Sequence, residues 1–331
     1  MTTAHLPPTM RALQQLSFEG IEAMHLIDAP VPVPGDNEIL VRVAAAGVNF
    51  ADLSRAHGTF LNGPQPPFLA GFEAAGEVVA TGAAVEIPLG SSVVGVGVGA
   101  FAEYLVMRAA TAMPLPAGWN AKQALGLMVN WPTAIAALKP LGRLAVGETV
   151  LIHAAAGATG QAALKIAKHG GARVIASASA RKHEALRALG ADHVLGSGRE
   201  DLAAQVLELT SGAGADLVLE SAGGATFAAS LAAAKRVTGR VVVYGLSGGN
   251  ASISNWDLVY RYPVQVMGFN LGTLIGAAPQ VFGAVMGEMS RLIAAGVITP
   301  AEPRSYALSD GPRALAELEA RATIGKLALI P

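Results

Sequence analysis

Three polar side chains stand directly after an apolar run in the middle of the chain. Ser179, Arg181 and Lys182 follow "ARVIASA", residues 172–178. One hydroxyl and two cations suit a phosphate group, which they bind through charge-assisted hydrogen bonds. The alternative is that they form the solvated first turn of a following helix, but cations there oppose the helix dipole. We therefore predict an anion-binding site at these residues.

A glycine turn precedes this site. Ala155, Gly157 and Gly160 fit a relaxed G-x-G-x-x-G pattern, between the apolar run "TVLIHAA" and a helical pattern. Glycine lets the backbone approach a pyrophosphate, and the helix N-terminus supplies N–H groups and a positive dipole end. The alternative is a turn of small residues that only permits tight packing. We favour dinucleotide binding, by Ala156, Gly157, Ala158, Thr159 and Gly160.

The residues after the second strand indicate which dinucleotide binds. An NAD-specific fold places Asp or Glu about 20 residues after the turn, where it holds the ribose 2′-hydroxyl. The corresponding window, residues 178–182, contains no acid. A 2′-phosphate would repel a carboxylate and attract cations. The sequence therefore predicts NADPH as the cofactor, with Ser179, Arg181 and Lys182 at its 2′-phosphate; which cation makes the contact stays open.

The elements around these residues alternate between strands and helices. From residue 150 onward this alternation predicts βαβ units and a parallel sheet. The strands are continuous apolar runs, as expected when both faces of a sheet are covered. Before residue 120 the chain is typical of β structure, with strand patterns at 38–48, 76–82 and 91–99. The predicted fold class is α/β.

Composition excludes several classes of protein. The chain has 331 residues, a net charge of −1, 52% hydrophobic and 14% charged residues, and no cysteine. This charge gives no support for nucleic-acid binding. The lack of cysteine excludes disulfides, thiolate zinc sites and cysteine nucleophiles. The N-terminal segment lacks the apolar region of a signal peptide, so a cytoplasmic location is expected.

One uncharged run, residues 263–287, resembles a membrane span in length. Pro279 and scattered amides argue against that reading. We expect instead a strand, an apolar turn, and a helix that begins near Pro279 and stops at Gly296. No membrane partner is therefore predicted.

Several longer segments match one family pattern, in the same order along nearly the whole chain. They are "AAGVNFADLSRAHGTF" (45–60), "LAGFEAAGEVVATG" (69–82), "AAAGATGQAALKIA" (154–167), "GRVVVYGLSG" and "ARATIGKLALIP". With these segments the chain resembles the zinc-independent quinone oxidoreductases of the medium-chain dehydrogenase/reductase superfamily.

The resemblance implies a GroES-like β domain from residues 1–126 and 267–331, and a Rossmann domain inserted at 127–266. Zinc-dependent relatives carry a Cys near position 49 and a His after the Gly of "GFE". Here Asn49 and Phe72 stand at those places. An amide and a phenyl ring do not replace a thiolate and an imidazole at zinc. The resemblance thus implies a metal-free site.

For the chemistry, the resemblance implies hydride transfer from NADPH to a carbonyl acceptor. Without a metal, hydrogen-bond donors must stabilise the charge on the acceptor oxygen. Asn49 is the expected donor, because relatives carry the same Asn. Asp52 is placed with it in the catalytic site, as a support that bonds nearby backbone N–H groups. Relatives often have Tyr at the positions of Ser54 and Phe60, so water or the cofactor ribose is expected to deliver the proton.

The resemblance also implies further cofactor contacts. Most follow predicted strands, where open α/β sheets bind ligands; for each, the alternative is loop packing. The residues are Asn130, Thr133, Ser221, Ala222, Gly223, Tyr244, Gly245, Leu246, Ser247, Phe269, Asn270 and Lys326.

The expected function is an NADPH-dependent oxidoreductase that reduces quinones or other α,β-unsaturated carbonyls. The alternatives are an enoyl-thioester reductase of the same superfamily and an NADPH-binding protein with weak or no catalysis. A serine hydrolase, suggested by "GLSGG" at 245–249, would need a helix directly after Ser247. Relatives are commonly homodimers, and the apolar run 262–269 is the expected edge strand for pairing.

Overall fold

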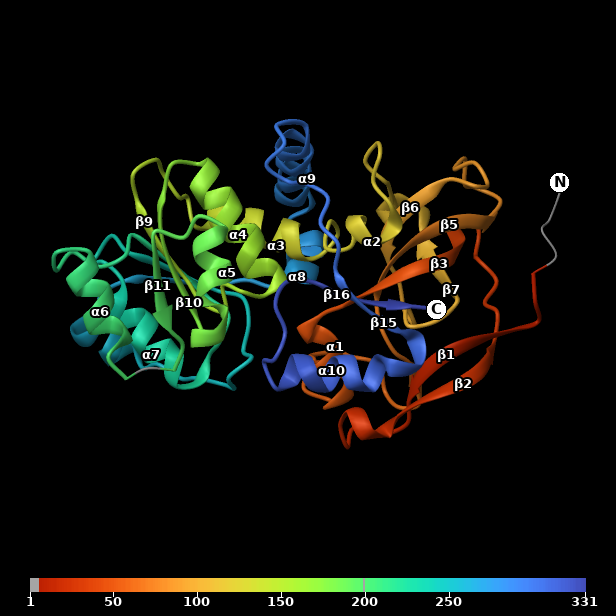
Figure 1. Cartoon of the computed structure of the whole chain (residues 1–331), viewed down its shortest axis with the longest axis horizontal. Helices are drawn as coiled ribbons and strands as arrows, with labels where there is room; N and C mark the ends of the chain where they lie inside the picture. Colours follow the sequence, from red (N-terminus) through yellow and green to blue (C-terminus); the bar gives the residue numbers. More distant parts are fainter. Residues whose placement is uncertain (1–5, 199) are drawn as a thin grey trace. The chain divides into compact units, whose positions relative to one another are not determined.

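The computed structural model describes residues 6–198 and 200–331, and the chain divides into two compact units (Figure 1). Unit 1 combines Met1–Met128 with Pro300–Pro331, and unit 2 is Val129–Thr299. Residues 267–299, which the sequence assigned to the returning catalytic segment, lie in unit 2. The reason is that strand β14 (Gln265–Gly268), which overlaps the start of this segment, completes the unit 2 sheet. Helix α9 (Pro279–Ala294) in turn packs against helix α3 (Asn130–Ala136) of the same unit.

Unit 1 consists mainly of two sheets, in which all strand pairs are antiparallel except the parallel pair β15 and β16. The smaller has the order β2-β1-β4, and the larger β15-β16-β3-β5-β6-β8 with β7 paired to β3. The strands are β1 Thr9–Gln15, β2 Met24–Pro30, β3 Glu38–Val48, β4 Phe68–Leu69, β5 Glu73–Thr81, β6 Ser92–Val96, β7 Tyr104–Arg108, β8 Met113–Pro114, β15 Arg304–Ala307 and β16 Leu327–Ile330. The helices are α1 Phe50–Ala56, α2 Ala121–Ala124 and α10 Gly311–Glu319.

Strand β16 is the element that brings the C-terminal segment into unit 1. It pairs antiparallel with β3, with Leu327 opposite Val48. Its alternating apolar residues are buried in the same core as those of β3 and β5. This pairing places the residue before β16 beside the residue after β3.

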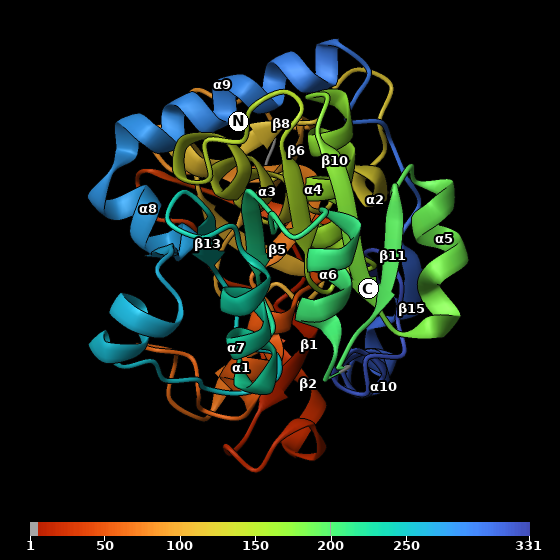
Figure 2. The same cartoon turned by 90° about the vertical axis from the view of Figure 1, so that its left-hand side faces the viewer.

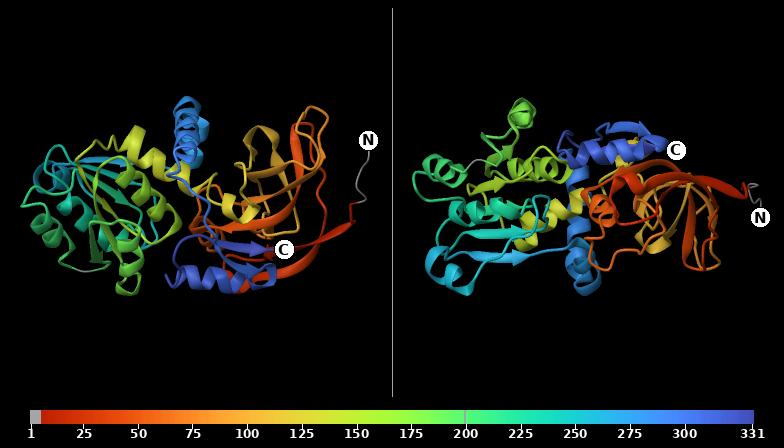
Figure 3. Two further views of the ribbon diagram at one scale, coloured as in Figure 1. Left: turned by 45° about the horizontal axis from the view of Figure 1, so that its top comes forward. Right: turned by 90° about the horizontal axis from the view of Figure 1, so that it is seen from below.

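Unit 2 is a six-stranded, fully parallel sheet in the order β11-β10-β9-β12-β13-β14. The strands are β9 Thr149–Ile152, β10 Arg173–Ala178, β11 His193–Gly196, β12 Leu217–Glu220, β13 Arg240–Val243 and β14 Gln265–Gly268. Helices lie on both faces of the sheet (Figures 2 and 3). The strand order reverses between β9 and β12, which is where such sheets bind ligands. The predicted α/β class is confirmed.

The helices of unit 2 are α3 Asn130–Ala136, α4 Ala158–His169, α5 His183–Ala188, α6 Leu202–Leu209, α7 Gly224–Ala233, α8 Leu271–Ala277 and α9 Pro279–Ala294. The expected helix from Pro279 is confirmed as α9. The expected turn before it is instead the short helix α8, which Asn270 caps. In the part of the chain that the structure describes, no helix has the length and hydropathy needed to cross a membrane.

Candidate active site

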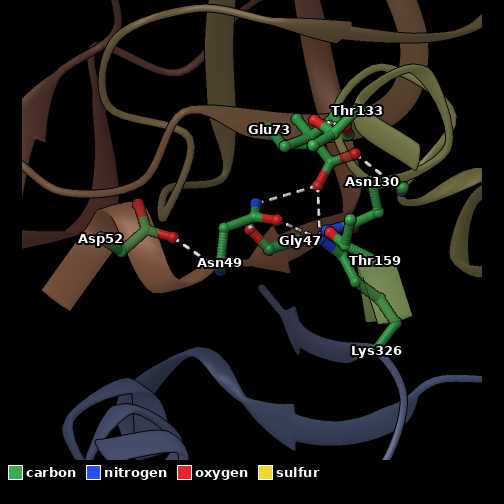
Figure 4. A network of polar contacts seen from close by, with 10 residues as sticks. Gly47, Asn49, Asp52, Glu73, Asn130, Thr133, Thr159 and Lys326 are labelled. Carbon is green, nitrogen blue, oxygen red and sulfur yellow. Dashed lines mark hydrogen bonds and ion pairs between the residues drawn. The ribbon is translucent and has the colours of Figure 1, made fainter. Parts of the chain in front are cut away.

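The turn from β3 into α1 places two of the predicted site residues. Asn49 is the N-cap of α1, and the Asp52 carboxylate accepts a hydrogen bond from the Asn49 backbone N–H at 2.8 Å. This contact satisfies one of the backbone donors that a helix N-terminus leaves without an intrahelical partner. Both residues are buried. Asp52 therefore holds the backbone of the residue whose side-chain amide contacts Glu73 (Figure 4).

Glu73, which the sequence reading did not select, forms the centre of the site in unit 1. It begins β5 opposite Gly47 and has no exposed surface. Its Oε2 accepts hydrogen bonds from Asn49 Nδ2 at 3.0 Å and from Lys326 Nζ at 2.6 Å. Its Oε1 accepts from the backbone N–H of Gly126 at 2.6 Å. Glu73 thus joins three segments that are far apart in the sequence (Figure 4).

The sequence does contain a signal for Glu73. It lies in the apolar stretch "LAGFEAAG", and an acid there predicts either an exposed side chain or a paired one, because fully buried carboxylates are rare without partners. Its partners, however, come from three distant segments.

The side-chain amide of Asn49 is fully engaged within unit 1. Its Nδ2 donates to Glu73 at 3.0 Å and to the carbonyl oxygen of Gly47 at 3.2 Å. Its Oδ1 accepts from Lys326 Nζ at 2.7 Å. A primary amide has two N–H donors, so both hydrogens are already donated. Asn49 is therefore held at both ends.

Gly47 is the residue that makes room for this network. A Cβ atom at this position would overlap the Glu73 carboxylate and lie 3.0 Å from Lys326 Cε. Real Cβ atoms do not approach other atoms that closely, so any side chain would displace the carboxylate. Glycine is thus required here by packing.

Arg55 and Phe72 form a second contact near α1. The Arg55 guanidinium lies over the Phe72 ring at 4.5 Å and over the Phe60 ring at 5.0 Å, within cation–π distance. Burial lowers the pKa of Arg55, while the nearby Asp52 opposes the shift. Phe72 stands where zinc-dependent relatives carry a His, and here its ring packs against the guanidinium of Arg55. Among the described residues, no three metal-ligating side chains form a cluster.

In unit 2 the glycine turn leads from β9 into α4. Gly157 is the N-cap of α4 and provides no side-chain cap, so the first N–H groups of this helix have no partner from that residue. At Gly160 a Cβ would lie 2.5 Å from the carbonyl oxygen of Ala154. Glycine at position 157 therefore leaves the N–H groups at the start of α4 uncapped by a side chain, and glycine at position 160 allows the helix to pack closely against Ala154. Ala156, Ala158 and Thr159 complete the turn.

Two predicted cofactor residues from different elements meet beside this turn. Asn130, in α3, donates from Nδ2 to Thr159 Oγ1 at 3.0 Å. Thr133, one turn further along α3, donates its hydroxyl to the carbonyl oxygen of Val129 at 2.6 Å. The first contact links α3 to the start of α4, and these two helices pack together.

The predicted phosphate site lies at the carboxyl end of β10. Ser179 directly follows the strand, and its Oγ is buried without a hydrogen-bond partner among the described residues. Arg181 and Lys182 follow in a short 3-10 turn over 180–182. A buried hydroxyl without a partner is unfavourable unless a ligand satisfies it. These residues therefore fit a polar group bound at the end of β10.

The loop after β12 is shaped by a buried carboxylate. Glu220 Oε1 accepts the backbone N–H groups of Ala222 at 2.6 Å and Gly223 at 2.8 Å. Its Oε2 accepts the hydroxyl of Ser230, which also contacts His153 Nε2 at 2.9 Å. Burial lowers the pKa of His153. Glu220 is a second residue that was not predicted from the sequence. Its carboxylate fixes the backbone of the loop that follows β12.

The loop after β13 packs against this first loop. Ser247 donates its backbone N–H to the carbonyl oxygen of Ser221 at 3.3 Å, and a Cβ on Gly245 would lie 2.7 Å from that same oxygen. Burial raises the pKa of Tyr244 to about 12, so it stays neutral, while Leu246 is exposed. No helix follows Ser247 directly, so the geometry of a hydrolase nucleophile is not formed.

Phe269 and Asn270 follow β14. The Phe269 N–H donates to the carbonyl oxygen of Val243 at 2.8 Å, which extends the pairing with β13. The Asn270 side chain accepts the backbone N–H of Thr273 at 3.0 Å and so caps α8. The residues predicted at the ends of β9, β10, β12, β13 and β14 therefore all lie at the carboxyl edge of one parallel sheet.

Comparison with known proteins identifies this architecture. Residues 35–117 match the family "Alcohol dehydrogenase GroES-like domain", and residues 158–291 match "Zinc-binding dehydrogenase". These two families together define the medium-chain dehydrogenase/reductase superfamily of oxidoreductases. The chain belongs to this superfamily, and quinone oxidoreductases are among its structural neighbours.

Two solved structures cover almost the whole chain. Quinone oxidoreductase from Escherichia coli, complexed with NADPH, is 31% identical with a TM-score of 0.89, over 97% of this chain and 100% of that one. Quinone oxidoreductase from Pseudomonas syringae is 30% identical with a TM-score of 0.90, over the same shares. Among curated proteins, bovine prostaglandin reductase-3 is 38% identical over 75% of this chain. The match spans 63% of the bovine protein's length, and 66% of that of the mouse protein.

Proposed function

We propose that the protein is an NADPH-dependent oxidoreductase that reduces quinones or other α,β-unsaturated carbonyls by zinc-free hydride transfer. The observation that carries the proposal is the phosphate site at the end of β10. Ser179 has a buried hydroxyl without a hydrogen-bond partner within residues 6–198 and 200–331, Arg181 and Lys182 follow it, and the window 178–182 contains no acid. This arrangement favours a 2′-phosphate over a 2′-hydroxyl.

The residues of unit 2 fit the rest of the cofactor. The turn 156–160 would hold the pyrophosphate at the N-terminus of α4, because backbone N–H groups and the helix dipole meet there. Asn130, Thr133 and the loops 221–223, 244–247 and 269–270 would hold the nicotinamide half. When bound, NADPH supplies the hydride. The protein's own task is to orient both partners and to stabilise the charge that develops on the acceptor.

Asn49 and Asp52 are the proposed catalytic residues in unit 1. Hydride addition places negative charge on the acceptor oxygen, and preoriented N–H donors stabilise it. Asp52 supports Asn49 through the backbone contact at 2.8 Å. A donation from the Asn49 amide to the acceptor requires the 3.2 Å contact with Gly47 to open. Lys326, which touches the same amide at 2.7 Å, is the nearby cation.

Two other functions share this scaffold. An enoyl-thioester reductase would use the same hydride chemistry on a C=C bond conjugated to a thioester. An NADPH-binding protein with weak or no catalysis is supported by Ser54 and Phe60, where relatives often carry Tyr. The quinone and enone function is supported by the two quinone oxidoreductases and by prostaglandin reductase-3 among the similar proteins, and the enoyl-thioester alternative is supported by the similar structure of the CurK enoyl reductase.

The test is steady-state oxidation of NADPH with a panel of quinones, enones and enoyl thioesters, in the presence and absence of a zinc chelator. We expect turnover with at least one quinone or enone and no effect of the chelator. Turnover confined to enoyl thioesters would select the first alternative. Tight NADPH binding without turnover of any acceptor would select the second.

We also propose a homodimer formed through β14. This strand is at the edge of the unit 2 sheet, and Gln265 and Val266 are exposed on it. An unprotected apolar edge strand offers unpaired backbone groups to a second copy.

A further inference from the structure

Glu73 is the one fully buried acid of unit 1 that joins its three distant segments, within the residues that the structure describes. Its carboxylate touches Asn49 after β3, Gly126 near the end of the first segment of unit 1, and Lys326 before β16. Glu73 was predicted neither from the family resemblance nor from the tendency of ligands to bind after the strands of a parallel sheet. Its contacts define what Asn49 and Lys326 can do.

The buried charge pair needs an explanation other than stability. Glu73 has 0% and Lys326 only 11% of its side-chain surface exposed, and their charged atoms are 2.6 Å apart. Removing two charges from water is unfavourable, and well-packed apolar residues often give a more stable protein. A pair kept in this position is therefore a candidate for a functional role.

The pair fixes the Asn49 amide in one orientation. In the observed orientation the amide nitrogen faces the carboxylate of Glu73 and the amide oxygen faces the ammonium of Lys326. A flipped amide would place N–H against the ammonium and oxygen against the carboxylate. Both contacts would be repulsive, so the amide hydrogens stay directed at Glu73 and Gly47.

We propose that Glu73 is a positioning residue, which locks Asn49 inward and thereby makes the Lys326 ammonium the group that stabilises the acceptor oxygen. This inference rests on the proposed reductase function and changes one assignment within its site: Lys326, and not Asn49, donates to the acceptor oxygen, and Asn49 becomes a positioning residue. Among Glu73, Asn49 and Lys326, only Lys326 is positively charged. It is also the most exposed of these three residues. Asn49 then acts through Lys326, by holding it at 2.7 Å.

The first test replaces Glu73 by Gln and compares it with Glu77→Gln. Glu77 lies on the same strand, where it forms an exposed ion pair with Arg42 at 2.7 Å, outside the network. In Glu73→Gln one oxygen becomes an NH2 group, so either Gly126 or the Lys326 and Asn49 pair loses its acceptor. We expect kcat to fall on the order of tenfold to a hundredfold, while the Kd for NADPH, measured by nicotinamide fluorescence, changes less than about threefold.

A second set separates positioning from folding. Glu73→Gln leaves a buried ammonium without its counter-ion and is expected to lower Tm. Adding Lys326→Met removes that ammonium, so Tm should recover, while kcat should stay low. If kcat recovers together with Tm, the pair is only structural and the proposal is wrong.

The roles of Asn49 and Lys326 are separated by Asn49→Leu and Lys326→Met. The proposal expects the larger loss of kcat in Lys326→Met, because Asn49 acts only through it. A larger loss in Asn49→Leu, with Lys326→Met changing mainly the Kd for NADPH, would make Asn49 the donor and overturn the inference. Wild-type protein that binds NADPH but turns over no acceptor would instead refute the proposed function itself, since the failure then precedes any substitution.

Discussion

The backbone N–H of Asn49 donates to the Asp52 carboxylate at 2.8 Å, in a region where both side chains are buried. Burial raises the pKa of Asp52 to about 7, although this hydrogen bond, Arg55 and Lys326 oppose the shift. The second carboxylate oxygen, Oδ1, is buried and has no hydrogen-bond partner in the part of the chain that the structure describes. Asp52 therefore changes its charge near neutral pH, at the start of the helix that carries Asn49.

The Asp52 pKa predicts how stability depends on pH. The folded protein binds a proton that the unfolded chain has released between the ordinary value of 3.8 and about 7. Stability should therefore fall as pH rises through this window, by at most about 1.4 kcal/mol per pH unit from this group. Asp52→Asn should flatten this dependence. Denaturant unfolding of wild type, Asp52→Asn and Glu77→Gln across the window provides the measurement, and an unchanged slope in Asp52→Asn would contradict the prediction.

Cofactor choice is expected to depend on Arg181 and Lys182. Each charge-assisted contact contributes roughly 1.5–3 kcal/mol, or on the order of tenfold to a hundredfold in affinity. The double variant Arg181→Ala/Lys182→Ala should raise the KM for NADPH strongly and leave NADH nearly unchanged, and high salt should have part of this effect. The measurement is kcat/KM with both cofactors, with Arg187→Ala in α5 as the control. Equal losses with NADPH and NADH would mean that the two cations serve folding or solubility.

Gly47→Ala should damage the site in unit 1 without a change of charge. The added methyl group would overlap the Glu73 carboxylate and displace it from Asn49 and Lys326. We expect kcat to fall by roughly tenfold or more, because small displacements of reacting groups have large effects. Gly283→Ala in α9 is the matched control, since a Cβ there meets nothing within 4 Å. Full activity of Gly47→Ala would show that the network tolerates displacement.

Glu220→Gln should loosen the loop after β12. The carboxylate accepts two backbone N–H groups, from Ala222 and Gly223, as well as the Ser230 hydroxyl, and an amide cannot accept all three in the same geometry. We expect a loss of about 1–3 kcal/mol in the free energy of unfolding and a higher Kd for NADPH. Glu208→Gln, on the exposed side of α6, is the control. If Glu220→Gln is destabilised but binds NADPH with unchanged affinity, the loop after β12 does not contribute to cofactor binding.

The assembly prediction is tested at the β14 edge. Wild-type protein should be a dimer by light scattering at micromolar concentration. Val266→Lys places a charge on the edge strand and should favour the monomer. Val146→Lys, at a residue that is 84% exposed and lies beside Gly171 before β10, should leave the dimer intact. A monomeric wild type would refute the proposed interface.

Much of the fold was predictable because its signals are local. Alternating strands and helices from residue 150 onward predicted the parallel sheet, and Pro279 marked the start of α9. Helix α8 was missed because "LGTLIGA" contains two glycines and no polar face, although Asn270 before it is a suitable cap. The residues at strand ends could be selected because all parallel strands end at one edge of the sheet.

The network in unit 1 was less predictable for a physical reason. Asn49, Glu73 and Lys326 meet because β3 pairs antiparallel with both β5 and β16. Neither pairing has a sequence signal near the residues it brings together. The acid in an apolar stretch was visible, but its partners depend on the register of the pairing.

The pairing of β16 with β3 also has a consequence for biosynthesis. Unit 2 is one continuous segment, so it has every strand of its sheet as soon as Thr299 has left the ribosome. The larger sheet of unit 1 still lacks β15 and β16 at that moment, and the end of β3, residues 46–48, stays without its β16 partner until residues 327–329 are synthesised. Lys326 directly precedes β16, so the nascent chain contains all of unit 2 before it contains all of the residues of the Glu73 network in unit 1.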